Sequence, residues 1–131
     1  MTASRSELRR ILVVDDDPDV RSVISLSLGR VGKMEVVEAH SGHDAIERLR
    51  RGTFDAIVLD VMMPGLDGPS TLERIRSEFG DSTTPVIFIT AKVQPAEVRR
   101  LIATGAAAVI AKPFDPMTLP DEVRTIIERA A

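Results

Sequence analysis

The sequence contains no cysteine, no tryptophan and no tyrosine, and four phenylalanines are its only aromatic residues. The absence of cysteine excludes disulfides, thiolate metal sites and a cysteine nucleophile. No apolar run approaches the roughly 20 residues that a membrane helix needs. The first ten residues, MTASRSELRR, also lack the apolar core of an export signal. We therefore expect a cytoplasmic protein that does not insert into a membrane.

An excess of positive charge is missing as well. Lys and Arg number 17 against 20 Asp and Glu, so the formal net charge is −3. Nucleic-acid-binding domains are normally basic, and this balance argues against nucleic acid as a partner. The 131 residues suffice for one domain with its own core. We expect a single domain over residues 1–131, with a core over about 9–129. The first eight or so residues should be frayed, and no room remains for an output domain after the last predicted helix.

What the sequence does contain is a series of short apolar runs. Four of the five are nearly continuous in Val, Ile, Leu and Ala, which is typical of strands buried on both faces of a parallel sheet. The second run is more mixed and suits an edge strand. The runs are ILVV (11–14), MEVVEA (34–39), AIVL (56–59), VIFI (86–89) and AVIA (108–111).

Amphipathic segments with helical spacing follow these runs. The first begins after Asp17-Pro18, where Asp17 is a plausible N-cap, and its apolar positions continue to Val31. Four more follow around residues 41–52, 72–79, 98–105 and 119–127. Strand and helix therefore alternate five times. Right-handed crossovers turn such a chain into a doubly wound α/β fold, a parallel sheet flanked by five helices.

Polar residues follow four of the five predicted strands. Each has an ordinary explanation alone: Asp15 and Asp16 as solvated loop residues, Thr90 as a turn residue, Lys112 as a solvated cation, and Asp17 as a cap. The carboxyl ends of parallel strands, however, meet at one edge of the sheet, where ligands of open α/β sheets bind.

Together with Asp60, which follows the third run, these residues predict a phosphoryl-transfer site. Adjacent carboxylates near a further carboxylate are typical of a Mg²⁺ site. A lysine and a threonine opposite it suit phosphoryl transfer, which depends on positioning and charge neutralisation. Asp60 is the candidate nucleophile and would form an acyl phosphate.

The stretches VVDDDP, VLDVMMPGLDG, FITA and AKPF resemble, in order and spacing, the receiver domain of bacterial two-component response regulators. The resemblance extends from about Ile11 to Arg129. It implies a flavodoxin-like fold with five parallel strands in the order 2-1-3-4-5. It also implies that Lys112-Pro113 is a cis peptide bond.

The resemblance further implies a role for each site residue. Asp60 corresponds to the phosphoacceptor. Asp16 corresponds to a direct Mg²⁺ ligand and Asp15 to one that acts mainly through water, with Asp60 and the backbone carbonyl of Met62 completing the protein ligands. Thr90 corresponds to the hydroxyl that bonds a phosphoryl oxygen.

Lys112 corresponds to the ammonium that pairs with the acyl phosphate. The function implied is a signalling module that accepts a phosphoryl group from a phosphohistidine of a sensor kinase or a histidine phosphotransfer protein. It would then change its affinity for a downstream partner protein. Such a module is no enzyme beyond catalysing its own phosphorylation and dephosphorylation.

Some positions depart from the family pattern or stay ordinary. Family members often carry Tyr or Phe three residues before the lysine, where this chain has Val109, so we expect readout through Thr90 and residues 91–95 instead. Met62 and Lys92 flank the expected phosphoryl site, at positions that in the family tune how fast water reaches the phosphoryl group. The two histidines, His40 and His43, are expected at the surface or in capping roles.

Two alternative functions remain open. Haloacid-dehalogenase-like phosphatases also carry an Asp-x-Asp pair after their first strand, which Asp15 and Asp17 satisfy. That alternative leaves Asp60 without a role and lacks the final acidic pair of those enzymes. A degenerate receiver that serves only as a binding scaffold is the other alternative, and the intact set of site residues argues against it.

Overall fold

The chain folds around one five-stranded parallel sheet in the order β2-β1-β3-β4-β5. The structure is a computed structural model, and it describes residues 8–80 and 84–130. This order and the alternation of strands with helices confirm the predicted fold class. The predicted frayed N-terminal segment falls largely on residues 1–7, outside the described residues. The strands are β1 (Arg10–Val14), β2 (Glu35–Ala39), β3 (Ala56–Asp60), β4 (Val86–Thr90) and β5 (Ala108–Ala111).

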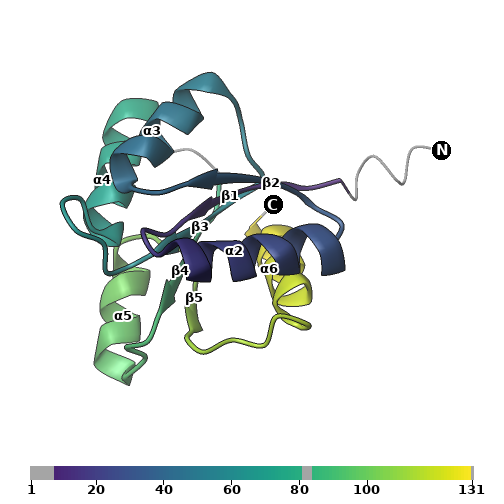
Figure 1. Cartoon of the computed structure of the whole chain (residues 1–131). Helices are drawn as coiled ribbons and strands as arrows, with labels where there is room; N and C mark the ends of the chain where they lie inside the picture. Colours follow the sequence, from purple (N-terminus) through teal and green to yellow (C-terminus); the bar gives the residue numbers. More distant parts are fainter. Residues whose placement is uncertain (1–7, 81–83, 131) are drawn as a thin grey trace.

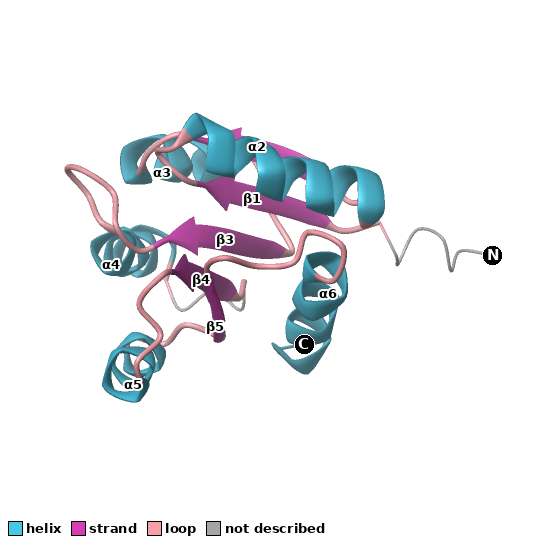
Figure 2. Cartoon of the chain, turned by 60° about the horizontal axis from the view of Figure 1, so that its bottom comes forward, coloured by secondary structure: helices cyan, strands magenta, loops and turns pink. Residues whose placement is uncertain are grey.

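Helices cover both faces of the sheet (Figures 1 and 2). The helices α2 and α6 pack on one face, while α3, α4 and α5 pack on the other. Within the described ranges, every helix is too short or too polar to span a lipid bilayer. The bounds are α2 (Pro18–Leu26), continued by a π-helical turn η1 (Ser27–Val31), then α3 (Gly42–Arg51), α4 (Gly68–Phe79), α5 (Pro95–Ala103) and α6 (Leu119–Ala130).

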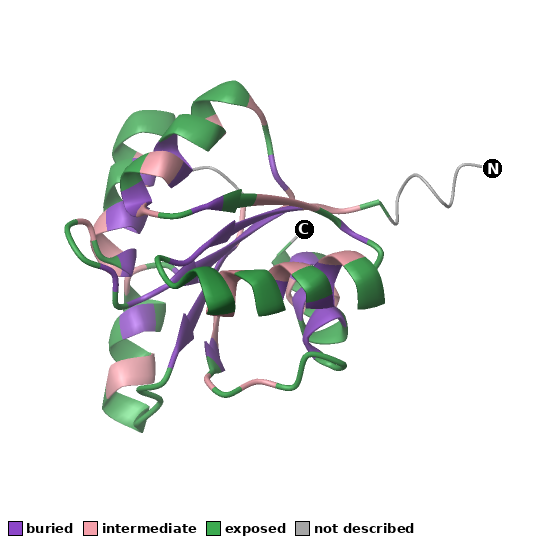
Figure 3. Ribbon diagram, in the orientation of Figure 1, coloured by how far each residue is buried: buried purple, intermediate pink, exposed green. Residues whose placement is uncertain are grey.

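The strand sequences explain the two-sided packing. Every residue of β3 and β4 is buried, and the burial runs through the centre of the molecule (Figure 3). Successive side chains of a strand point to opposite faces, so Leu12 joins the core under α3, α4 and α5, while Ile11 joins the core under α2 and α6. Strand β2 carries the exposed Glu35 and Glu38 and lies at the edge of the sheet, as its mixed composition predicts.

The first helix differs from the prediction of one regular helix to Val31. Its last turn is π-helical, and the Gly32 N–H bonds the Ser27 carbonyl at 3.0 Å. The buried Ser27 hydroxyl donates to the Pro116 carbonyl, 2.5 Å away in the loop between β5 and α6. This contact joins residues 89 positions apart, so the local spacing of apolar residues could not reveal it.

Gly68 generates a prediction about the link between β3 and α4. A Cβ atom at this position would lie 2.6 Å from the carbonyl oxygen of Asp60 and 2.9 Å from the Cα of Val61. Gly68→Ala should therefore lower the free energy of unfolding by about 1–3 kcal/mol, as overpacking does. Urea denaturation measures the change.

Gly29→Ala is the matched control, because a Cβ atom at Gly29 meets nothing closer than 3.8 Å. It should leave stability unchanged or raise it by about 0.5–1 kcal/mol, since alanine is the better helix former. Equal unfolding midpoints for the two variants would contradict the prediction. They would show that the backbone at Asp60 moves aside without a loss of folding stability.

Candidate functional site: an acidic cluster at the carboxyl ends of β1 and β3

Three carboxylates meet where β1 and β3 end. The two strands point their carboxyl ends toward the same edge of the sheet (Figure 2). Asp15 follows β1 and is 1% exposed, and Asp60 ends β3 and is 6% exposed, whereas Asp16 is open to solvent. One oxygen from each carboxylate lies within 4.8 Å of the others. The structure therefore brings together the three acids that the sequence singled out.

Lys112 supplies the positive charge at this cluster. It follows β5, and its backbone N–H bonds the carbonyl of Thr90 at 2.8 Å. Its ammonium lies 3.1 Å from Oδ1 of Asp60 and 3.4 Å from Oδ2 of Asp15. The peptide bond between Lys112 and Pro113 is cis, as the resemblance implied. One ammonium thus bonds two carboxylates that come from different strands.

The surroundings raise the pKa of both Asp60 and Lys112 above their ordinary values. Burial raises the pKa of Asp60 above its ordinary value, the nearby charge of Asp15 raises it further, and the bond from Lys112 only partly opposes this. Burial by itself would lower the pKa of Lys112, but the hydrogen bond to Asp60 and the charge of Asp15 outweigh burial and raise it. The ion pair with Lys112 therefore does not offset the full free-energy cost of ionising the buried Asp60.

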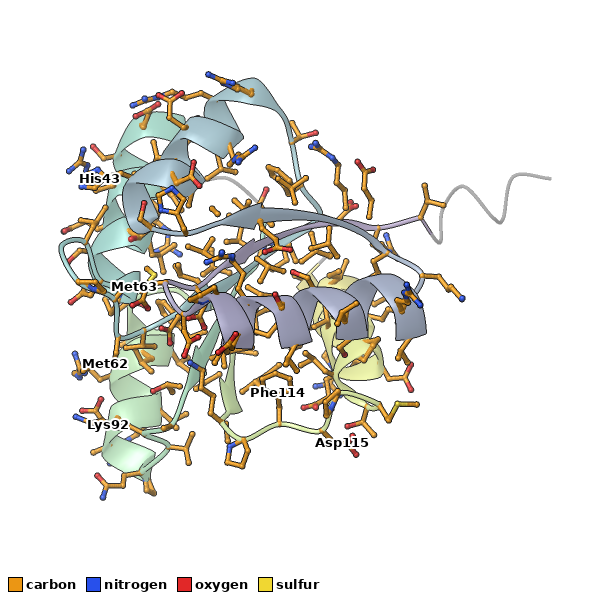
Figure 4. The ribbon with its side chains drawn as sticks, viewed as in Figure 1. His43, Met62, Met63, Lys92, Phe114 and Asp115 are labelled. Carbon is orange, nitrogen blue, oxygen red and sulfur yellow. The ribbon has the colours of Figure 1, made fainter. Side chains whose placement is uncertain are left out.

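Thr90 lies at the end of β4, on the neighbouring strand. The register of β3 and β4 aligns Asp60 with Ile89, the residue before Thr90. Thr90 is buried, and its hydroxyl oxygen accepts the N–H of Lys92 at 3.1 Å. The side chains of Met62 and Lys92 are exposed on the same side of the molecule (Figure 4). Both residues lie in loops that leave the carboxyl ends of β3 and β4.

Asp17 caps α2. Its carboxylate accepts the N–H groups of Asp19 and Val20, at 2.9 and 3.4 Å. Its own N–H bonds Oδ1 of Asp15 at 2.9 Å. The prediction of a cap is confirmed, and the Asp-x-Asp reading of Asp15 and Asp17 loses support because one of its two carboxylates holds the helix N-terminus.

Arg21 is the site residue that sequence reasoning missed. Its guanidinium donates to the backbone carbonyl of Asp15 at 2.8 Å and to the carboxylate of Glu38 at 2.9 Å. Its position on α2 carries no local signal, because its partners lie on other elements. Neither histidine belongs to the cluster of Asp15, Asp16 and Asp60. The imidazole of His40 lies 3.5 Å from the carboxylate of Asp44, and His43 is on α3 (Figure 4).

The donor set fits a hard divalent cation. Mg²⁺ and Ca²⁺ are bound by oxygen ligands, mainly carboxylates, carbonyls and water. Asp15, Asp16 and Asp60 offer three carboxylates in one place, and the exposed Asp16 leaves room for water. No other group of three acidic, histidine or cysteine side chains in the described ranges has this spacing.

The raised pKa of Asp60 generates a prediction about stability and pH. A carboxyl whose folded pKa exceeds its unfolded pKa binds its proton more tightly when folded, so stability falls as pH rises through that interval. Asp60→Asn removes the titrating carboxyl, so the variant does not lose this stability as pH rises. In EDTA the variant should be more stable than the parent protein at pH 7, and the difference should vanish as pH falls toward the ordinary carboxyl value of about 4.

Urea midpoints at a series of pH values measure this difference. A variant less stable than the parent at pH 7 would contradict the prediction. It would mean that the ion pair of Lys112 with Asp60 stabilises the fold by more than burial of the charge and repulsion from Asp15 destabilise it.

Comparisons with known proteins show the same fold in solved structures. Chemotaxis protein CheY4 of Vibrio cholerae superposes with a TM-score of 0.83 at 29% identity, over 91% of this chain and 98% of that one. A putative response regulator from Chloroflexus aurantiacus gives a TM-score of 0.83 at 32% identity, over 93% and 99%.

Curated relatives are similar to this chain in sequence as well. Transcriptional regulatory protein CseB of Streptomyces avermitilis is 36% identical over 124 residues, which are 95% of this chain and 51% of that protein. The probable transcriptional regulator ycf27 of Porphyra purpurea is 34% identical over 125 residues, 95% of this chain and 50% of that protein. The chain thus spans about half the length of these relatives. Residues 11–124 match the family described as the response regulator receiver domain, and the chain belongs to that family.

Proposed function

We propose that Asp60 accepts a phosphoryl group from a phosphohistidine of a sensor histidine kinase or a histidine phosphotransfer protein. The reaction depends on Mg²⁺, takes place in the cytoplasm, and changes the affinity of the chain for a downstream protein. The observation that carries this proposal is the buried carboxylate of Asp60, 3.1 Å from an ammonium and beside two further acids.

In the transfer step, a carboxylate oxygen of Asp60 forms a bond to phosphorus while the bond between phosphorus and the histidine nitrogen breaks. The leaving imidazole nitrogen takes up a proton. Asp60 must be ionised to attack, and the neighbouring ammonium of Lys112, 3.1 Å away, favours that form. Lys112 remains charged and stays with the acyl phosphate, where it offsets the charge of the transferred group.

The cation would be held by Asp15, Asp16 and Asp60, with the backbone carbonyl of Met62 as a further ligand. When bound, Mg²⁺ supplies charge neutralisation and orients the phosphoryl oxygens. Asp16 is the most accessible of the three acids, which suits a direct ligand whose other neighbours are water molecules. The buried Asp15 already shares its carboxylate between Lys112 and the Asp17 N–H, which suits a contact through water.

Thr90 is proposed to carry the signal from the phosphoryl group to the loop that precedes α5. Its hydroxyl can donate a hydrogen bond to a phosphoryl oxygen while it accepts one from the N–H of Lys92. Val109 is half-buried against the core under α3, α4 and α5, and its β-branched side chain has no polar tip. Readout therefore depends on Thr90 and residues 91–95.

The first test is chemical trapping of the phosphoryl group. After incubation with Mg²⁺ and a small phosphodonor, borohydride reduction and peptide mass spectrometry should locate the label on Asp60 alone. Asp60→Asn should remain unlabelled, and EDTA should prevent labelling of the parent protein. Label on Asp60 in EDTA, or full labelling of Asp60→Asn, would refute the assignment.

Asp16→Asn and Asp17→Asn form a matched pair for the same assay. Asp16→Asn should slow labelling because a direct anionic ligand is lost. Asp17→Asn should have little effect, because asparagine caps helices about as well as aspartate.

The second test concerns readout, with beryllofluoride as a phosphoryl mimic. Amide NMR shifts of residues 91–103 should change on adding the mimic to the parent protein and to Val109→Ala, but not to Thr90→Ala. Val109→Ala should cost about 1 kcal/mol of stability because a half-buried side chain is shortened. Loss of the shifts in Val109→Ala together with their retention in Thr90→Ala would overturn this route of readout.

A further inference from the structure

Arg21 joins the edge of the sheet to the backbone of the acidic cluster. It lies in the first turns of α2, the helix that runs beside β1 and β2 (Figure 1). Its Nε donates to Oε1 of Glu38 on β2 at 2.9 Å, and its Nη1 donates to the carbonyl oxygen of Asp15 at 2.8 Å. The arginine side chain is 19% exposed and the glutamate 43%.

The carbonyl of Asp15 belongs to the peptide unit that connects Asp15 to Asp16. A peptide unit is planar, so a bond that holds this oxygen also fixes the direction in which the Asp16 backbone leaves. The carboxylate of Asp15 has its own anchors, the Asp17 N–H and Lys112. Within residues 8–80 and 84–130 no recorded hydrogen bond reaches the exposed carboxylate of Asp16, so the backbone sets the direction from which its side chain starts.

The ion pair with Glu38 does not explain Arg21 by itself. Partly exposed pairs contribute little to stability. An unpaired guanidinium next to three carboxylates would also repel a cation. Glu38 offsets that charge and orients the planar guanidinium, which leaves a second N–H directed at the Asp15 carbonyl. A lysine has one point-like ammonium and cannot span both acceptors with this fixed geometry.

We propose that Arg21 is a positioning residue for the cation site. It holds the peptide between Asp15 and Asp16 so that the Asp16 carboxylate meets the strict octahedral geometry of Mg²⁺, and Glu38 orients the arginine. This inference rests on the proposed function, because it assumes that the cation binds at this cluster. It predicts an effect on ion selectivity, since Ca²⁺ tolerates irregular and larger coordination shells.

The experiment measures binding of Mg²⁺ and of Ca²⁺ by isothermal titration calorimetry, below the unfolding temperature of every variant. In Arg21→Lys, which keeps the charge, the Kd for Mg²⁺ should rise by about ten-fold, the lower end for outer-shell partners of metal ligands. The Kd for Ca²⁺ should change by less than about two-fold. Arg21→Met should also weaken Mg²⁺ relative to Ca²⁺. A purely electrostatic role would instead tighten both ions equally in Arg21→Met.

Arg124→Lys is the matched control. Arg124, on α6, also donates to a backbone carbonyl and pairs with an acid, Asp121. Its carbonyl acceptor is Gly32, which follows η1 at the end of the helix opposite to Arg21. Substitution of Arg124 should lower the unfolding temperature without changing the ratio of the two Kd values.

Asp16→Asn separates failure of the inference from failure of the proposed function. If Asp16→Asn leaves Mg²⁺ binding unchanged, the cation site itself is wrong, and the inference falls with it. If Asp16→Asn weakens binding while Arg21→Lys keeps the parent ratio of Kd values, the positioning role of Arg21 is overturned and the site stands.

Discussion

The mutual repulsion of three carboxylates is the constraint on which the functional edge of this fold depends. Two unit charges about 4 Å apart repel by about 4 kcal/mol at an effective dielectric constant of 20. Asp15 and Asp60 are also buried, so water screens them poorly. The parallel pairing of β1 with β3 nevertheless holds them side by side, because β1 and β3 lie inside the sheet, between β2 and β4.

Several contacts keep this strained arrangement in place. Lys112 comes from the far side of the sheet, where its backbone is tied to β4 by a bond to Thr90. The Asp17 N–H and Arg21 hold the side chain and the carbonyl of Asp15. Each contact uses a group that a neighbouring strand or helix positions, so the site is a property of the packed sheet and not of its loops alone.

The parts of the fold that sequence reasoning predicted are those with a local physical signal. Continuous apolar runs mark the buried strands, the two glutamates mark the edge strand β2, and Asp17 followed by Pro18 marks a helix start. The convergence of Asp15, Asp16, Asp60 and Lys112 was predictable as well, because parallel strands end at a common edge.

The parts that were missed depend on contacts between residues far apart in sequence. Ser27 bonds Pro116 across 89 positions, and that bond accompanies the π-helical turn. Arg21 bonds Glu38 across 17 positions, and neither residue has a neighbour that signals the pairing. Periodicity and turn chemistry describe one segment at a time, so contacts of this kind appear only once the segments are packed.

The contact of Lys112 with both Asp15 and Asp60 has a consequence for the charge of any guest ion. With all groups ionised, three carboxylates against one ammonium leave two uncompensated negative charges in the cluster. A divalent ion would cancel them completely, whereas a monovalent ion would leave one negative charge and a trivalent ion would add a positive one. Lys112 acts as a fixed counterion of the cluster, so the net charge of these groups would favour a divalent ion over monovalent and trivalent ions.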